Sequence, residues 1–591
     1  MLYKMNLKNV VLLFTLLLSF TSCDKENVIT LEVENTQVEF THNGASEKYI
    51  QFYTNAKIVN VRSSSVDNWC KASIDNDKIK ITVAENNETE SYRSTTLTVE
   101  AEGANKALIT VTQAGKEAPY RTFVIKADKN NLQNDIIATI DEDTKTIKFR
   151  TNEWIGSVKN LIVDFDLRGE VYVNNELQTS GESTQSFLEE LIYTVKGEDN
   201  SDISYKVVPS GPMFTGLPVV SIYIDGNKEV IEKKTKLPAS FNLIDIEQSE
   251  FDMSNVEMTI RGRGNSTWGM PKKPYRVDFP SKTSLFGLPK AKKWVFLANY
   301  QDPTFLMNDI AFELGRRFGL EFNHTSIHVE LFVNGKYRGN YQMTEQKETG
   351  KGRVDINTDG GFLVELDVYF DEDYQFESDY FKLPVMVQGP KLSNESEMDY
   401  IKDAIHEFEK TLYGDNFPND DYEQYTDARS LINFMLINEL LRNQELYHPK
   451  STYLYKEADS KIKWGPLWDF DWGFGYNGGD RYFVRNDLLF YADRAYQGDN
   501  RSGLQFFCRF FEIPGFREKY YAQWQEMKPK AESILEYIDT KAKELEKSQA
   551  ENFNIDNTTP NTKNTTYSEL ISQMKSWLQN RINFMDKELT K

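Results

Sequence analysis

The sequence predicts a multidomain protein in which two N-terminal all-β, Ig-like sandwiches precede a larger α+β module. Its 591 residues suit three or four domains at about 150 residues each. Up to about residue 210, apolar and polar residues alternate in short stretches, as half-buried strands require. Beyond that point strand and helix patterns are mixed, and seven of the nine tryptophans occur there.

The first predicted sandwich covers residues 29–115. Alternation is clear over residues 78–83 and 96–100, and clusters of Asn, Asp and Gly separate the short strands. We expect Trp69 to be a core residue of this sandwich, with a ligand platform as the alternative.

The second predicted sandwich covers residues 120–210 and follows a linker at 116–119. Residues 193–195 and 205–208 are expected to supply its closing strands. No chemical motif occurs there, so this part is predicted to be a spacer. Pro209 and Pro212 mark the next boundary.

The α+β module is expected over residues 214–591. It opens on a strand at 218–224 and continues with helices. Ser396 and Asp399 have capping-box spacing, as do Thr566 and Glu569, and residues 431–441 form an apolar helix.

The charge balance excludes one class of partner. Lys and Arg number 69 against 90 for Asp and Glu, which gives a formal net charge of −21. A broad nucleic-acid surface needs the opposite sign, so we expect no nucleic-acid partner.

The amino terminus predicts export. Lys4 and Lys8 precede an apolar run at 10–20, which is too short to span a bilayer but suits a signal peptide over residues 1–22. The small residues before Cys23 resemble a bacterial lipobox. This resemblance implies a lipid anchor on Cys23, a tether over 23–28 and a lipoprotein at the outer membrane, on its periplasmic face or at the cell surface. The acidic tether resembles surface-export signals of Bacteroidetes. Cys70 and Cys508 are expected to be buried thiols.

Three blocks carry the polar residues that chemistry would need. The first, at 261–276, combines two glycines with Arg263, Asn265, Ser266 and Lys273. Five cations within sixteen residues of an acidic chain favour a phosphate site, and a solvated β-turn is an equal alternative.

The second block contains Asp469 and Asp471 among tryptophans and glycines. On an extended segment, carboxylates at i and i+2 share one face and offer two oxygens to a hard cation such as Mg²⁺. A solvated acidic turn is the alternative. The third block, at 443–455, is a polar loop between a helix and a strand, where phosphotransferases hold their base and second metal ligand. Taken without the other two blocks, an ordinary solvated connection is the better interpretation.

The histidines predict no metal site. His324 and His328 would share a strand face roughly 13 Å apart, too far to bind one metal.

Taken in order, these motifs resemble the CotH kinase family. The similarity includes the run Arg-Gly-Arg-Gly-Asn-Ser-Thr-Trp at 261–268, the segment at 333–341, Glu345, and Trp-Asp-Phe-Asp at 468–471. It implies an atypical protein-kinase-like fold, binding of ATP and Mg²⁺, and phosphoryl transfer to Ser or Thr. Residues 29–115, with Trp69, Arg93 and the ending at 111–115, resemble a BACON domain, which implies contact with a glycan.

The resemblance also implies roles for single residues. Arg263, Asn265 and Ser266 would lie near the nucleotide, and Lys273 would contact its phosphates with Glu345 or Glu365 as ion-pair partner. Asp471 would hold Mg²⁺ with Asp469. Glu445 stands where the family has its catalytic Asp, and Ser451 or Thr452 stands where the family has a metal-binding Asn.

Two functions stay open at this stage. One is a lipid-anchored kinase that acts on a surface or exported protein. The other is a catalytically degenerate surface lipoprotein that binds glycan or protein.

Overall fold

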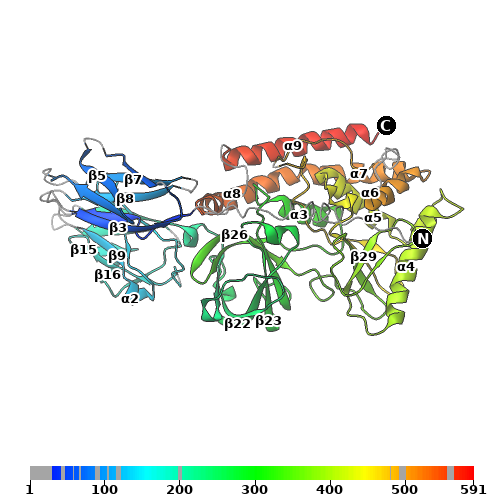
Figure 1. Cartoon of the computed structure of the whole chain (residues 1–591), viewed down its shortest axis with the longest axis horizontal. Coiled ribbons are helices and arrows are strands. Elements are labelled where there is room, and N and C mark those ends of the chain that lie inside the picture. Colours follow the sequence, from blue (N-terminus) through cyan, green and yellow to red (C-terminus); the bar gives the residue numbers. More distant parts are fainter. Residues whose placement is uncertain are drawn as a thin grey trace, which may run out of the picture.

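The computed structural model of the protein describes residues 30–40, 47–57, 59–65, 68–86, 93–102, 106–114, 121–156, 158–188, 190–196, 202–479, 481–490, 501–555 and 565–590. The predicted signal peptide, Cys23, the tether and the linker at 116–119 lie outside these residues. The chain forms three structural units: the first and second lie one above the other at the left end of the molecule, and the third extends to the right (Figure 1).

The first unit packs two four-stranded sheets around one apolar core. Strand β2 pairs in parallel with β8, and the other pairs are antiparallel. One sheet consists of β1 (Leu31–Val33), β3 (Glu47–Thr54), β6 (Lys78–Val83) and β5 (Cys70–Asp75). The other consists of β2 (Gln37–Phe40), β8 (Ala107–Gln113), β7 (Arg93–Ala101) and β4 (Val59–Ser63).

The predicted core role of Trp69 is confirmed. Its side chain is buried in the core of the first unit, and the Arg93 guanidinium lies 4.6 Å from the ring centroid. Cys70 and Cys508 are both buried, and neither is part of a disulfide.

The second unit is also all-β. Its six-stranded sheet runs in the order β11-β12-β19-β18-β15-β16, beside smaller sheets of β10-β9-β14 and β13-β17. The expected closing strands β18 and β19 do pair with each other. The elements are β9 (Thr122–Ile125), α2 (Ala127–Asn130), β10 (Ile136–Ile137), β11 (Thr139–Asp141), β12 (Thr146–Arg150), β13 (Leu161–Ile162), β14 (Asp164–Asp166), β15 (Glu170–Val173), β16 (Glu176–Gln178), β17 (Thr184–Gln185), β18 (Leu191–Lys196) and β19 (Ile203–Ser210).

The second unit, predicted to be a spacer, shares its core with the third unit. Its core includes Val219, Ile244 and Phe332 of the third unit, and Phe332 meets Trp154 edge to face at 6.0 Å. The boundary at Gly211 is tight as well, because a Cβ there would lie 2.0 Å from the Thr151 carbonyl oxygen.

The third unit begins with a closed seven-stranded barrel in the order β20-β21-β22-β23-β24-β26-β25. Strands β20 and β25 close it in parallel, and α3 (Met307–Phe318) connects β24 to β25. The strands are β20 (Val219–Ile224), β21 (Leu237–Ile244), β22 (Met253–Gly262), β23 (Tyr275–Thr283), β24 (Ala291–Leu297), β25 (Ile327–Val333) and β26 (Lys336–Glu345).

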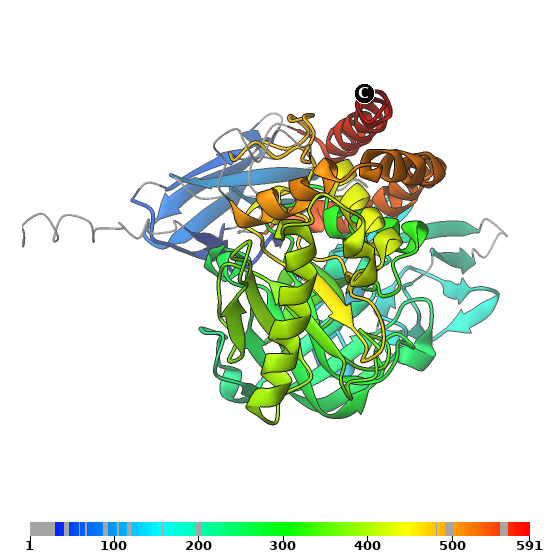
Figure 2. The ribbon, with the colours of Figure 1, turned by 90° about the vertical axis from the view of Figure 1, so that its right-hand side faces the viewer.

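A five-stranded antiparallel sheet and a set of helices complete this unit, so its predicted α+β character is confirmed. In Figure 2 helix α4 lies in front, and α7 to α9 lie above the strands. The sheet contains β28 (Gln375–Glu377), β29 (Pro384–Gly389), β27 (Phe362–Leu366), β30 (Thr452–Lys456) and β31 (Lys463–Trp464). The helices are α4 (Glu395–Tyr413), α5 (Ala428–Leu441), α6 (Ser502–Arg509), α7 (Phe516–Glu532), α8 (Ile534–Phe553) and α9 (Tyr567–Glu588).

The helix ends show which local signals were sufficient. Helix α9 begins with the predicted capping box of Thr566 and Glu569. The cap predicted at Ser396 is wrong, because Asn394 caps α4 and accepts from the Glu397 amide at 3.1 Å. Helix α5 is buried throughout Leu431–Leu441, and its apolar residues accordingly lie on all of its faces.

Helix α8 joins the barrel through buried polar contacts. Asn340 on β26 donates to Ser548 at 2.8 Å, and Lys272 donates to Asn552 at 2.9 Å. Next to Asn552, Glu551 accepts from Arg150 of the second unit. The last turns of α8 therefore contact both the barrel and the second unit.

Candidate active site

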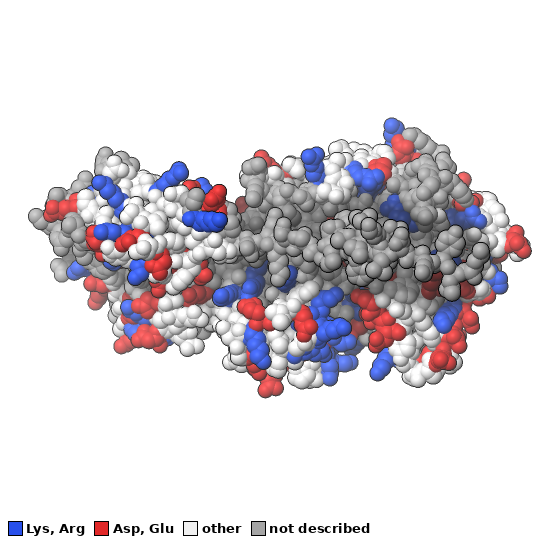
Figure 3. Space-filling view, in the orientation of Figure 1, with Lys and Arg blue, Asp and Glu red and all other residues white. Residues whose placement is uncertain are grey.

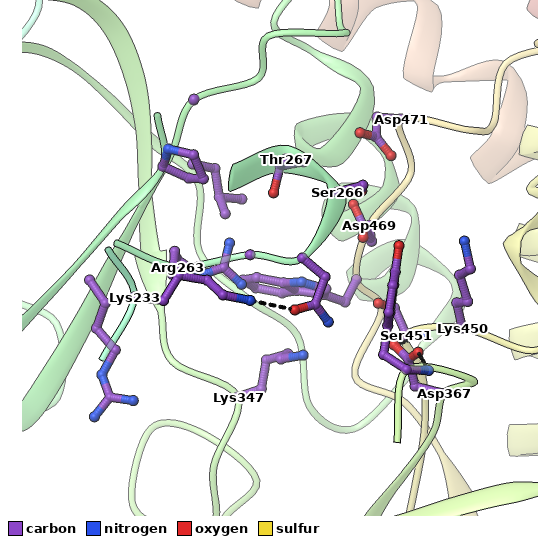
Figure 4. Close-up of a pocket in the computed structure, with 18 of the residues that line it drawn as sticks. Lys233, Arg263, Ser266, Thr267, Lys347, Asp367, Lys450, Ser451, Asp469 and Asp471 are labelled. Carbon is purple, nitrogen blue, oxygen red and sulfur yellow. Dashed lines mark hydrogen bonds between the residues drawn. The ribbon is translucent and has the colours of Figure 1, made fainter. Parts of the chain in front are cut away.

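A cleft of about 500 Å³ lies between the barrel and the five-stranded sheet. Residues of both signs line it, from the turn after β22, the segment after β26, the end of β27, and the segments around 445–451 and 468–471 (Figure 4). The polar lining includes Lys233, Arg263, Asn265, Ser266, Lys347, Glu365, Asp367, Glu445, Lys450, Ser451, Asp469 and Asp471.

The turn at 262–269 forms the barrel side of the cleft, and its two first glycines are required for its shape. Gly264 has a φ of +82°, and a Cβ there would lie 2.1 Å from Thr267 Oγ1. A Cβ on Gly262 would lie 2.4 Å from the Trp268 ring. The chain then enters the short 3₁₀ helix η5 (Ser266–Gly269), which brings Ser266 to the cleft.

Cations and their partners extend this wall. The Arg263 guanidinium lies 5.4 Å from the centroid of the Trp468 ring. Asn265 accepts from Lys233 at 2.8 Å and donates to Asp371 at 3.1 Å. In Figure 3 many Lys and Arg side chains gather over the barrel on the face drawn, beside a group of acids.

Asp469 and Asp471 form part of the opposite wall, but not on a strand as predicted. Asp469 has a φ of +63°, so the segment turns sharply there. The Phe470 amide between them donates to Asn308 of α3 at 3.0 Å, which fixes the turn. Both carboxylates nevertheless line the cleft. Burial and the charges of Asp469 and Glu445 raise the pKa of Asp471 well above its usual range.

Glu445 lies deep in the same wall, on the 3₁₀ helix η7 (Gln444–Tyr447), which Asn443 caps. Its side chain is 5 % exposed, and Oε2 lies 3.7 Å from Lys450 Nζ. Burial and the charge of Asp469 raise the pKa of Glu445 to about 8, although Lys450 opposes the shift. The Lys450 ammonium also lies 4.3 Å from the Trp472 ring centroid.

The floor of the cleft contains a second ion pair. Lys347 Nζ lies 3.1 Å from Glu365 Oε1, and Gln388 donates to Glu365 Oε2 at 2.7 Å. Two residues further along, burial and the charge of Glu365 raise the pKa of Asp367 to about 6. The Ser451 amide donates to Asp367 at 3.3 Å, so Ser451 is held at the cleft by its backbone.

The structure brings together seven of the nine predicted site residues. They are Arg263, Asn265, Ser266, Glu445, Ser451, Asp469 and Asp471.

Lys273 and Glu345 do not line the cleft, and their expected positions are wrong. Lys273 Nζ donates to the Trp268 carbonyl at 2.8 Å. Glu345 accepts from the Thr325 amide at 2.8 Å and lies 3.7 Å from His324. Burial raises the pKa of Glu345, but His324 outweighs it, and the pKa falls to about 2. Lys347 and Glu365 occupy the place in the cleft expected for this pair.

Sequence reasoning missed Lys347, Asp367 and Lys450. Lys347 is the second residue after the long strand β26, and Asp367 is the first residue after β27, at i+2 from Glu365. Charged residues at strand ends were thus the available signal. Lys450 stood in the third polar block but had no assigned role.

Among the residues that the structure describes, no group of three or more His, Cys, Asp or Glu side chains stands where it could hold a metal ion. Within the same part of the chain, none of the helices has both the length and the apolar character that a membrane span needs.

The family model for the CotH kinase protein matches residues 260–585, which is more than half of the chain. The chain belongs to the CotH kinase protein family. The model for the BACON domain, described as an N-terminal domain proposed to be a binding domain, matches residues 60–114. No curated protein matches.

Among solved structures, a GH5 xyloglucanase from Bacteroides ovatus is 35% identical over 15% of this chain and 20% of its own, with a TM-score of 0.13. A protein from Bacteroides thetaiotaomicron is 22% identical over 14% of this chain and 80% of its own, with a TM-score of 0.12. This CotH-family chain thus spans a fifth of the xyloglucanase, and TM-scores this low establish no shared overall fold.

Proposed function

We propose that the cleft binds ATP with Mg²⁺ and transfers the γ-phosphoryl group to a Ser or Thr hydroxyl of an exported protein. The observation that carries this proposal is the division of charge across the cleft. Arg263 and Lys347 line one side of the cleft, where they would contact a polyphosphate, and Asp469 and Asp471 lie across from them.

The donor set of Asp469 and Asp471 fits a magnesium ion. Two half-buried carboxylates whose side chains interact favour a cation or a proton between them, in line with the raised pKa of Asp471. Mg²⁺ commonly takes one or two protein carboxylates and completes its shell with phosphate oxygens and water. When bound, the ion would neutralise charge on the phosphates as the phosphoryl group moves.

Glu445 is the proposed general base. The acceptor oxygen bonds to the γ-phosphorus, the bond to the β,γ-bridging oxygen breaks, the hydroxyl proton passes to Glu445, and ADP leaves. Once the charge of Asp469 is balanced, a main cause of the high pKa of Glu445 disappears, so the carboxylate form becomes accessible near neutral pH. Lys450, 3.7 Å from Glu445, would hold it in place.

The location of the reaction follows from the amino terminus in this proposal. The chain would be exported and held at a membrane through the lipid on Cys23, and its acceptor would be another exported protein.

Binding is the first test. We expect ATP to raise the melting temperature of the chain lacking residues 1–22 in the presence of Mg²⁺, and not in the presence of a chelator. Asp471→Asn should abolish this rise and label transfer to a Ser- and Thr-containing acceptor. The unliganded variant should melt no lower than the wild type, because the substitution removes a buried repulsion. A wild type without any Mg²⁺-dependent response to ATP would overturn the proposal.

A second candidate function, glycan binding, rests on a different observation. Tyr49 and Tyr53 are 48% and 58% exposed and point to the same face of β3, beside Lys80. Such spaced rings suit the apolar faces of sugars. On a glycan array, replacement of both tyrosines by Ala should remove binding, whereas Leu108→Ala, an equally exposed apolar residue of the other sheet, should not. A blank array for the wild type would end this candidate.

A further inference from the structure

The segment after Asp471 returns to the end of helix α5 and is fixed there by buried charges. The Phe474 amide donates to the Leu441 carbonyl at 2.6 Å, and the Leu489 and Phe490 amides both donate to the carboxylate of Glu439. Glu439 is itself buried and paired with Arg581 of α9. Residues 471–479 and 481–490 are therefore attached to the same helix end that leads into the loop of Glu445.

Arg442 lies between helix α5 and the loop of Glu445, and it also contacts the segment after Asp471. It directly follows α5 with a φ of +49°, a left-handed conformation that usually selects Gly or Asn at a helix end. Its side chain is fully buried. A large side chain in this strained backbone position needs a compensating interaction.

The compensating interaction is a two-pronged ion pair with Asp487. Arg442 Nε lies 2.9 Å from Asp487 Oδ1, and its terminal nitrogen lies 2.7 Å from Oδ2. Arg485 adds a second guanidinium at 3.0 Å. Paired guanidinium and carboxylate groups of this geometry are among the stronger charged contacts in proteins. Burial raises the pKa of Asp487, but Arg442 and Arg485 outweigh it and lower it well below the usual range.

The sequence of the segment after Asp471 indicates what this ion pair could replace. In many phosphotransferases, the loop after the metal-binding carboxylate is ordered only when a phosphorylated residue binds an arginine near the catalytic loop. Here residues 472–501 contain no Ser or Thr, and their hydroxyl side chains are the four tyrosines at 476, 482, 491 and 496. A carboxylate that belongs to the segment occupies the arginine instead.

We propose that Arg442 and Asp487 are positioning residues that hold the segment after Asp471 against the loop of Glu445, so that the cleft is assembled without phosphorylation of that segment. This inference rests on the proposed phosphotransfer function. Neither residue lines the cleft, so both act through Asn443, Glu445 and Asp471. Asn443, next to Arg442, connects the loop of Glu445 with the segment of Asp469 and Asp471, because its side-chain amide lies 3.5 Å from the Asp469 carbonyl oxygen.

The test compares Asp487→Asn with Asp487→Glu in the chain lacking residues 1–22. In Asp487→Asn, we expect amide hydrogen exchange over 472–490 to become at least tenfold faster and Mg²⁺·ATP affinity to fall at least fivefold. Asp487→Glu keeps the charge and should recover most of both. The matched control is Asp539→Asn, which removes an exposed ion pair with Lys575 between α8 and α9 and should change neither quantity.

Three outcomes would overturn the inference. Unchanged exchange in Asp487→Asn would show that the ion pair does not hold the segment. Faster exchange with unchanged Mg²⁺·ATP affinity would make the pair merely structural. Loss of protection in the wild type after phosphatase treatment would show that a phosphate holds it. If the wild type binds no Mg²⁺·ATP, the proposed function fails, and the exchange measurement alone then decides whether the ion pair holds the segment.

Discussion

Glu445, Asp469 and Asp471 share a small volume where charge is poorly solvated. The charge of Asp469 raises the pKa of both Glu445 and Asp471. Proximity of these residues was predictable from the motifs, but their protonation was not, because it depends on burial and on side chains from distant parts of the chain. Asp302, for example, adds to the repulsion on Asp471 although 169 positions separate the two residues.

The pH dependence of stability should reveal Glu445. Its pKa is near 8 in the folded chain against 4.5 ordinarily, so the folded state binds the proton more tightly. Stability due to this group is complete below about pH 4.5 and is lost as pH rises towards 8. Glu445→Gln resembles the protonated acid at every pH. We expect it to melt like the wild type at pH 5 and several degrees higher at pH 8. The control Glu250→Gln replaces an exposed carboxyl group and should show no such trend. If Glu445 were ionised at both pH values, Glu445→Gln would show no trend either.

Lys347 and Lys273 can be separated by one pair of variants. Lys347→Met is combined with Glu365→Gln, because a single change would leave a buried carboxylate unpaired. A lost contact between a cation and phosphate is worth about 1.5–3 kcal/mol, so ATP affinity should fall about 10- to 100-fold. Lys273→Met should change ATP affinity less than twofold, because the Lys273 ammonium donates to the Trp268 carbonyl. Equal losses in a calorimetric titration would restore the role first expected of Lys273.

At the scale of elements, local patterns predicted strands and helices well where the stabilising contact joins residues that are close in the sequence. The capping box of α9 is such a case, because its two residues satisfy each other. The turn at Asp469 is the opposite case. Its left-handed backbone depends on Asn308 from α3, and no pattern near residue 469 shows that contact. The same limitation explains Lys347, whose partner Glu365 comes from another strand.

The turn at 262–269 supports a prediction with an internal control. Gly264→Ala places a methyl group 2.1 Å from Thr267 Oγ1 at a φ of +82°, so the turn must move. We expect a loss of about 1–3 kcal/mol in the free energy of unfolding and weaker ATP binding. Gly269 belongs to the same turn and has open space around it, so Gly269→Ala should preserve affinity. Denaturant titration and nucleotide titration of both variants provide the measurement.

At the scale of the whole molecule, the order of the three units was predictable from the sequence. The shared core that joins the second unit to the third was not. Alternation marks a strand but does not reveal whether its outer face meets solvent or another domain. Phe332 belongs to a barrel strand, yet its ring packs in the core of the second unit. Composition also assigned no chemistry to residues 120–210, and this made them look like a spacer.

Truncation should show that the second unit and the barrel are inseparable. A chain that starts at Arg121 should keep the melting temperature of the CotH part. A chain that starts at Thr215 exposes Val219, Ile244 and Phe332 and loses the ion pair from Arg150 to Glu551. We expect it to melt several degrees lower or to aggregate. Equal thermal unfolding of the two chains would mean that the shared core contributes nothing.

The formal charge of −21 counts every Asp and Glu as ionised. Burial and the charge of Asp469 raise the pKa of both Glu445 and Asp471, so this count overstates the negative charge of the cleft. A divalent cation bound by Asp469 and Asp471 would therefore release protons into the solvent. The heat of such binding therefore contains the ionisation heat of the buffer, and titrations in phosphate and in Tris would differ by that amount for each proton released.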